Sequence, residues 1–236
     1  FKKVAKVLST AGIVLSDVQE EIIKLRKSGM NTAEIMAATG MSETTVSAYS
    51  PKISPEQPMN QSEIGDYAIG IIYATSYVAK ENGKEYVFAR NKDPWPIKFL
   101  ADISGKNMYV SNETYCVKCK NIPSIPDINA VISKKDFLRA YIELHGVLDL
   151  QNTLKGKRLR LRIYGKYDVV NYINHNLPAK EKKIQSIKNK IDGGYTGETS
   201  AVYYQSQHEI PDILEWLDGE PRNEKVWKKW NKLMAF

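Results

Sequence analysis

Three arginines alternate with apolar residues in one short segment, and this row is the strongest candidate for chemistry in the sequence. The segment reads Arg158-Leu-Arg-Leu-Arg-Ile163. A β-strand sends successive side chains to opposite faces, so Arg158, Arg160 and Arg162 would share one face while the residues between them pack under helices. An arginine fork pairs bidentately with phosphates and with guanine edges. The row therefore predicts a surface that binds a polyanion.

Lysines extend this pattern in three other predicted strands or hairpins. Lys118 and Lys120 share a face by the same alternation, as do Lys188 and Lys190, and Arg90 ends another predicted strand. Opposite charges are sparse nearby in the sequence, so three arginines on an open face would repel one another unless an anion lay there. The alternative is a solvated sheet face whose charges serve solubility alone.

The net charge of +7 is concentrated in the same part of the chain of 236 residues. Residues 151–200 contain eleven Lys and Arg against four Asp and Glu. Residues 1–50 carry +1, residues 51–150 balance to zero, and residues 201–236 carry −1. A localised basic surface is the electrostatic footprint of a polyanionic partner, usually nucleic acid.

Other chemistry is sparse in the sequence. Cys116 and Cys119 form one Cys-x-x-Cys, but a zinc site would need a second pair or histidines at matching spacing, so we expect two reduced thiols in a strand. His145, His175 and His208 are dispersed, and neither a metal nor another cofactor is predicted. The sequence has no P-loop, no dinucleotide-binding glycine pattern and no apolar run of about 18 residues that would span a membrane.

The first fifty residues predict three short helices, the last two over 33–39 and 43–49. The stretch Thr32-Ala-Glu-Ile-Met-Ala-Ala-Thr-Gly-Met-Ser-Glu-Thr-Thr-Val46 resembles bacterial helix-turn-helix domains, with Gly40 at the turn that needs a positive φ. In such domains the exposed residues of the last helix enter the major groove. The resemblance implies DNA contacts from four residues, which are Glu43, Thr44, Thr45 and Ser47.

Ala48 stands where members of that helix-turn-helix family often carry arginine. This departure implies a weak or supporting DNA contact from the N-terminal module. A helical domain that contacts other proteins is the alternative interpretation.

The remainder of the chain repeats one unit, and this is the strongest organisational feature of the sequence. Each copy reads as helix, hairpin, helix, hairpin, helix, with Asn82-Gly83 as a strong hairpin turn in the first copy. We therefore expect five segments. They are a helical domain over 1–50, a proline-rich linker over 51–60, repeats over 61–132 and 133–221, and a C-terminal amphipathic helix over 222–236.

The opening helix of the second copy carries the sequence Leu138-Arg-Ala-Tyr-Ile-Glu-Leu-His-Gly146. It resembles, position for position, the nine-residue signature of the LAGLIDADG homing endonucleases, with Ala140 replacing the first Gly and Glu143 replacing the first Asp. The first copy matches less closely, over Ala68-Ile-Gly-Ile-Ile-Tyr-Ala-Thr-Ser76. The resemblance covers both repeats and rests more on the doubled element order than on either nonapeptide.

The resemblance implies a fold of the α+β class, in which a small all-α domain precedes a two-repeat (αββαββα)2 saddle that lies in the DNA major groove. The opening helices of the two copies would pack against each other. Small residues would allow their close approach, namely Gly70, Ala74, Ala140 and Gly146.

In this family an acid at the end of each signature helix binds divalent metal for DNA cleavage. The matching positions here are Thr75 and His145, and neither is a carboxylate, the ligand that Mg²⁺ prefers. His145 could act as a general base or bind a softer metal, but a packed or solvated histidine is the commoner case. We therefore expect no catalytic residues and no enzyme activity.

These features predict a sequence-specific double-stranded DNA-binding protein, a transcription regulator derived from a catalytically inactive LAGLIDADG endonuclease. It would be similar in kind to the WhiA-type bacterial regulators. A monomer carrying both copies would cover a pseudopalindromic site, and the protein would be cytoplasmic and associated with the nucleoid. The first alternative is an active homing endonuclease with atypical metal ligands, and the second is a protein-interaction module.

Overall fold

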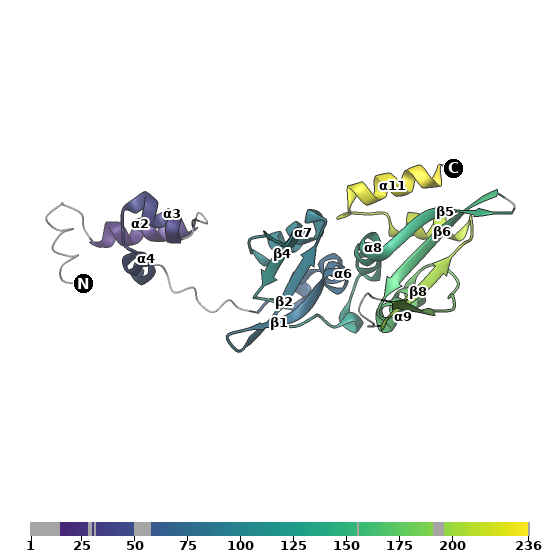
Figure 1. Ribbon diagram of the computed structural model, residues 1–236, viewed down its shortest axis with the longest axis horizontal. Helices are drawn as coiled ribbons and strands as arrows, with labels where there is room; N and C mark the ends of the chain where they lie inside the picture. The colour runs from purple at the N-terminus through teal and green to yellow at the C-terminus, as the bar shows by residue number, and fades with distance from the viewer. Residues whose placement is uncertain are drawn as a thin grey trace. The chain divides into compact units, whose positions relative to one another are not determined.

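The chain divides into two compact units, residues 1–56 and 57–236. The computed structural model describes residues 15–27, 30, 32–49, 58–154, 156–190 and 196–235. The described part of the first unit is helical, whereas the second unit contains two four-stranded sheets with helices (Figure 1).

The first unit has a small apolar core made by its helices. These are α2 (Leu15–Lys27), α3 (Thr32–Thr39) and α4 (Glu43–Tyr49). One buried residue of α4, Val46, packs with Ile35 of α3 and with Val18 and Ile22 of α2. Gly40 has a φ of +67°, so the turn between α3 and α4 has the backbone conformation that the sequence predicts.

The first repeat forms a sheet with the order β1-β2-β4-β3, in which all neighbours are antiparallel. The elements of this repeat are α5 (Gln61–Ile64), α6 (Asp66–Thr75), β1 (Ser76–Glu81), β2 (Lys84–Asn91), α7 (Pro94–Ser104), β3 (Tyr109–Ser111) and β4 (Thr114–Cys119). Asn82 and Gly83 both have positive φ, as the predicted hairpin turn requires. The single opening helix expected from Gln61 is wrong, because Gly65 at a φ of +78° separates α5 from α6.

The second repeat has the same order of elements and the equivalent sheet order, β5-β6-β8-β7. Its elements are α8 (Lys134–His145), β5 (Gly146–Thr153), β6 (Gly156–Gly165), α9 (Tyr167–Asn176), β7 (Gln185–Lys190), β8 (Thr196–Tyr204) and α10 (Glu209–Leu217), followed by α11 (Glu224–Met234). A short 3₁₀ helix, η1 (Ile128–Ala130), stands between the repeats where the sequence predicts a longer helix.

The two repeats meet where α6 packs against α8, and Figure 1 shows this helix pair between the two sheets. A Cβ on Gly70 would lie 2.5 Å from the carbonyl oxygen of Phe137 and 2.7 Å from the Cβ of Ala140. No side chain fits at that distance, so Gly70 is needed for the observed spacing. This confirms the predicted close approach of the two opening helices.

In each sheet one face is covered by helices and the other is left open. The inner face of the first sheet packs against α6 and α7, and that of the second packs against α8, α9 and α10. We call the uncovered face of each sheet its open face. None of the described helices has the length and apolar content that crossing a membrane requires.

Candidate nucleic-acid interface

The arginine row of β6 lies on the open face of the second sheet. The apolar residues between the arginines are buried in the core, as the predicted alternation requires. Arg158 is exposed, whereas the side chains of Arg160 and Arg162 retain 22% and 25% exposure. Arg158 and Arg160 also line an open polar groove together with Lys183 and Tyr203.

Two of the three arginines bind the same carboxylate. Asp149 of β5 is the Cα partner of Arg160 in the antiparallel register. Its oxygens accept bonds from Arg160 Nε and Nη2, both at 3.0 Å, and from Arg162 Nη2 at 2.6 Å. The expected scarcity of opposite charges is therefore wrong, because the partner comes from the neighbouring strand and is distant in sequence.

The guanidinium of Arg162 is held at a second point by an aromatic residue. Its Nη1 donates to the hydroxyl of Tyr164 at 3.0 Å, and the guanidinium carbon lies 5.8 Å from the centre of that ring. Asp149 and Tyr164 thus fix the position of two guanidiniums on an otherwise solvent-facing surface.

The lysines of the first sheet also share one acid. Lys118 and Lys120, in and just after β4, pair with Glu81 of β1 at 3.0 Å and 2.7 Å. Their side chains remain 38% and 54% exposed, so this is a solvent-screened pair of contacts. Arg90 ends β2 in an exposed position on the same open face, opposite Cys116.

Lys188 and Lys190 belong to β7, where the register sets their phase. Ser186 of β7 pairs with Ser200 of β8, which alternates with the buried Val202. Lys188 and Lys190 lie two and four residues beyond Ser186, so they fall in the alternation of the inner face. They do not continue the arginine row, and their DNA contact stays a prediction.

The predicted contact residues of the first unit lie together on α4. Glu43, Thr44 and Ser47 are exposed, whereas Thr45 is half-buried. The hydroxyl of Thr45 shares a hydrogen bond with that of Ser42 at 2.9 Å. The unit therefore offers a short polar helix face, and its use in DNA binding stays a prediction.

The ends of the two signature helices meet, as the resemblance implies. The ring Nε2 of His145 lies 2.8 Å from the carbonyl oxygen of Ala74, and its ring stacks on Tyr141 at 5.0 Å between centres. Thr75 is buried, and its hydroxyl donates to the carbonyl of Ile71 at 2.8 Å. Both side chains are thus used in contacts within and between the helices.

The residues at these helix ends do not fit a divalent metal of the kind the family uses. The described residues contain no group of three or more His, Cys, Asp or Glu side chains that could hold a metal ion. The nearby acids are already bound: Asp149 by two arginines, and Glu143 by the contacts described next. We therefore derive no metal-dependent step for this chain.

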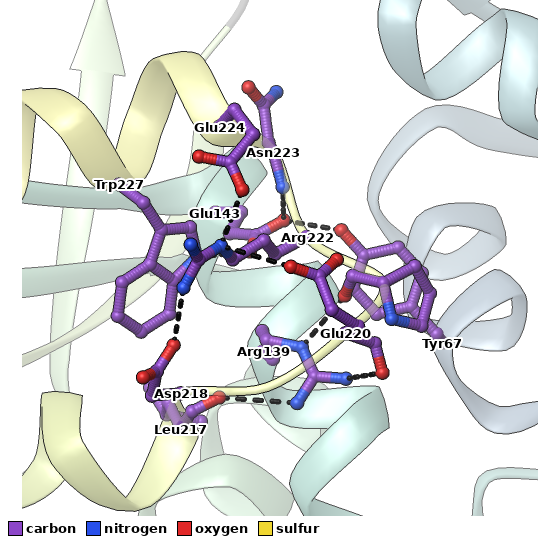
Figure 2. Close-up of polar contacts among 11 residues, drawn as sticks. Tyr67, Arg139, Glu143, Leu217, Asp218, Glu220, Arg222, Asn223, Glu224 and Trp227 are labelled. Carbon is purple, nitrogen blue, oxygen red and sulfur yellow. Dashed lines mark hydrogen bonds and ion pairs between the residues drawn. The ribbon is translucent and has the colours of Figure 1, made fainter.

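Glu143, the residue at the first Asp of the signature, is buried at the repeat interface (Figure 2). It accepts hydrogen bonds from the Tyr67 hydroxyl and the Trp227 indole, both at 2.5 Å, and from the Asn223 backbone N–H at 3.1 Å. Burial raises the pKa of the Glu143 carboxyl above its usual value, and it also raises the pKa of Tyr67. This carboxyl therefore joins α6, α8 and α11.

Arg139 of α8 holds the segment before α11 in place, also at the repeat interface (Figure 2). It donates to the carbonyl oxygens of Leu217, Glu220 and Pro221 at 3.2, 3.1 and 2.9 Å. Its side chain is 1% exposed and pairs with Asp136. The second signature helix thus serves as an anchor for the C-terminal helix.

Asp149 is the site residue that sequence reasoning missed as a partner of the arginines. A signal for it was present, because the strands around residues 147–152 and 158–164 were both expected. A hairpin closed at Thr153 and Gly156 places Asp149 opposite Arg160, as observed. Without the closing pair, a shift of one residue would have put the carboxylate on the other face.

Comparisons with known proteins support the fold alone. No protein-family model and no curated protein matches the sequence. The I-LtrWI LAGLIDADG homing endonuclease bound to target DNA gives a TM-score of 0.51 at 12% identity, covering 75% of this chain and 90% of that one. The chain has the two-repeat LAGLIDADG fold. The I-GzeII LAGLIDADG homing endonuclease in complex with its DNA target gives 0.48 at 11% identity, covering 72% and 89%.

The LAGLIDADG fold confirms the expected α+β class and the doubled element order. It also corrects the expectation that the chain is not an enzyme. The solved structures that share the fold are homing endonucleases, which are enzymes. That expectation depended on two helix-end positions, Thr75 and His145, and the side chains at two positions do not decide the activity of a whole fold.

Proposed function

We propose that this protein binds double-stranded DNA sequence-specifically through the open faces of its two sheets and regulates transcription. The observation that carries the proposal is the arginine row on the open face of β6. Arg158, Arg160 and Arg162 point away from the core on a strand whose other face is fully packed. Guanidinium forks of this kind match phosphate and guanine edges.

The fold and the charge distribution support the same partner. The I-LtrWI structure, which shares the fold, was solved with its target DNA bound. The basic excess of this chain lies in residues 151–200, which form most of the second sheet. The polar residues of α4 would add contacts to flanking DNA, and one chain with two sheets would bind as a monomer on the nucleoid.

Selection of bound duplexes from a random library tests the proposal directly. A long motif should emerge, and its affinity should fall steeply with salt because binding releases condensed counterions. Failure to select any motif at low salt would contradict the proposal. Asp102→Asn is a suitable control, since it changes the charge of an exposed acid on α7 that pairs with Lys98.

The second candidate function is site-specific DNA cleavage, and the shared fold of homing endonucleases is the observation that favours it. Incubating the selected duplex with Mg²⁺ or Mn²⁺ tests this candidate. A staggered cut within the motif would support an endonuclease. An intact duplex over many hours at saturating protein would leave binding as the activity.

A further inference from the structure

The Asp149 carboxylate holds two arginines of the proposed DNA surface in one arrangement. It bonds Arg160 through both of its oxygens, which fixes the plane of that guanidinium as well as its position. The same carboxylate bonds Arg162, whose other end is held by Tyr164. The three charged side chains keep 31%, 22% and 25% exposure, so the cluster lies at the surface and is partly shielded from water.

The pattern of used and unused donors gives Arg160 a defined free edge. An arginine has five N–H donors. Asp149 takes the Nε hydrogen and one on Nη2, so the two hydrogens on Nη1 and the second one on Nη2 remain. These remaining donors lie along the outer edge of the fork. Two of them match the paired acceptors that guanine presents in the major groove.

A free arginine in this position would bind phosphate and bases equally well, because its side chain samples many rotamers. Fixing the fork beforehand removes the cost of ordering it on binding, which is on the order of a kcal/mol for a flexible side chain. It also selects the one orientation in which the outer edge can meet a base. The benefit of Asp149 would therefore lie in discrimination between bases, since a carboxylate near phosphates reduces affinity.

We infer that Asp149 is a positioning residue for base recognition, which orients Arg160 and Arg162 toward guanine edges in the major groove. This inference rests on the proposed DNA binding. It predicts opposite effects on two quantities, since removing the carboxylate should weaken discrimination between bases while strengthening non-specific binding. A role limited to holding β5 and β6 together would not separate the two.

The test measures dissociation constants of the whole chain for its selected duplex, for every single mismatch in it, and for an unrelated duplex. For Asp149→Asn we expect the preference for the selected duplex to fall about tenfold, the value of one lost bidentate base contact. The loss should concentrate at the base pairs beneath Arg160 and Arg162. Affinity for the unrelated duplex should stay the same or rise, because one negative charge is gone.

Two further variants separate positioning from a change in charge or folding. Asp102→Asn makes the same change of charge on α7, far from the arginine row in sequence, and should leave the mismatch profile unchanged. Arg160→Lys keeps the positive charge but loses the planar fork, so it should show the same mismatch losses as Asp149→Asn. The double variant should lose little more than Arg160→Lys alone, because both changes remove one contact.

Each result has a defined meaning. Wild-type protein without any sequence preference would contradict the proposed function itself. A wild-type preference that Asp149→Asn leaves intact would overturn only the inference about Asp149, as would additive losses in the double variant. Should Asp149→Asn unfold, Arg160→Lys alone decides, and an unchanged mismatch profile in that variant would also overturn the inference.

Discussion

Arg158 is the arginine of the row that has no ion pair with the described residues, and it is exposed. It is therefore expected to contact phosphate, which contributes to affinity and not to base choice. Arg158→Ala should weaken selected and unrelated duplexes alike and reduce the slope of log affinity against log salt by about 1. Titrations at several salt concentrations measure this slope, and a loss confined to single base pairs would contradict the assignment.

Asp149 is also expected to titrate at unusually low pH. The hydrogen bond from Arg160, together with the charges of Arg160 and Arg162, holds the pKa of this carboxyl below its ordinary value. A lowered folded-state pKa favours the ionised form, so the stabilising contribution is present above the unfolded-state pKa of about 3.9 and is lost as pH falls through the folded-state pKa. NMR titration of the carboxyl carbon measures it, and Arg160→Gln should raise the pKa.

The packing of α6 on α8 makes a prediction about one glycine at the scale of elements. Alanine usually favours a helix over glycine by about 0.5–1 kcal/mol. At Gly70 the added Cβ would overlap the backbone of Phe137 and the side chain of Ala140, so Gly70→Ala should instead destabilise the protein by about 1–3 kcal/mol. Chemical denaturation measures the sign, and a stabilised variant would contradict the tight packing.

The attachment of α11 depends on the buried Glu143 carboxyl. Three donors point at it, whereas an amide offers one acceptor oxygen and a competing donor group. Glu143→Gln should therefore cost about 1–3 kcal/mol in unfolding free energy. Glu224→Gln, at the exposed start of α11, should stay within about 0.5 kcal/mol. Equal effects of the two variants would mean that the buried contacts contribute little.

At the scale of the whole second unit, the two open faces differ in chemistry, so the two halves of a bound site should differ too. The first sheet exposes Tyr77 and Tyr109, and its lysines share Glu81. Its half of the site should favour thymine methyl groups, while the half beneath the second sheet should contain guanines. The selected motif measures this, and a symmetric palindrome would contradict it.

Much of the second unit was predictable from the sequence because its signals are local. The alternation in β6 gives one buried and one open face without any knowledge of neighbouring strands. Asn82 and Gly83 have the left-handed backbone that a two-residue hairpin turn needs, and Gly40 has that of a helix turn. The doubled order of helices and hairpins then follows from hydrophobic periodicity along the chain.

The tertiary structure alone decided which groups meet across long separations in sequence. Asp149 reaches Arg160 and Arg162 only in one strand register, and a shift of one residue would reverse its face. The partners of Glu143 lie 76 to 84 residues away in α6 and near the start of α11. Periodicity and turn chemistry act over a few residues, whereas register and packing select these contacts from the whole chain.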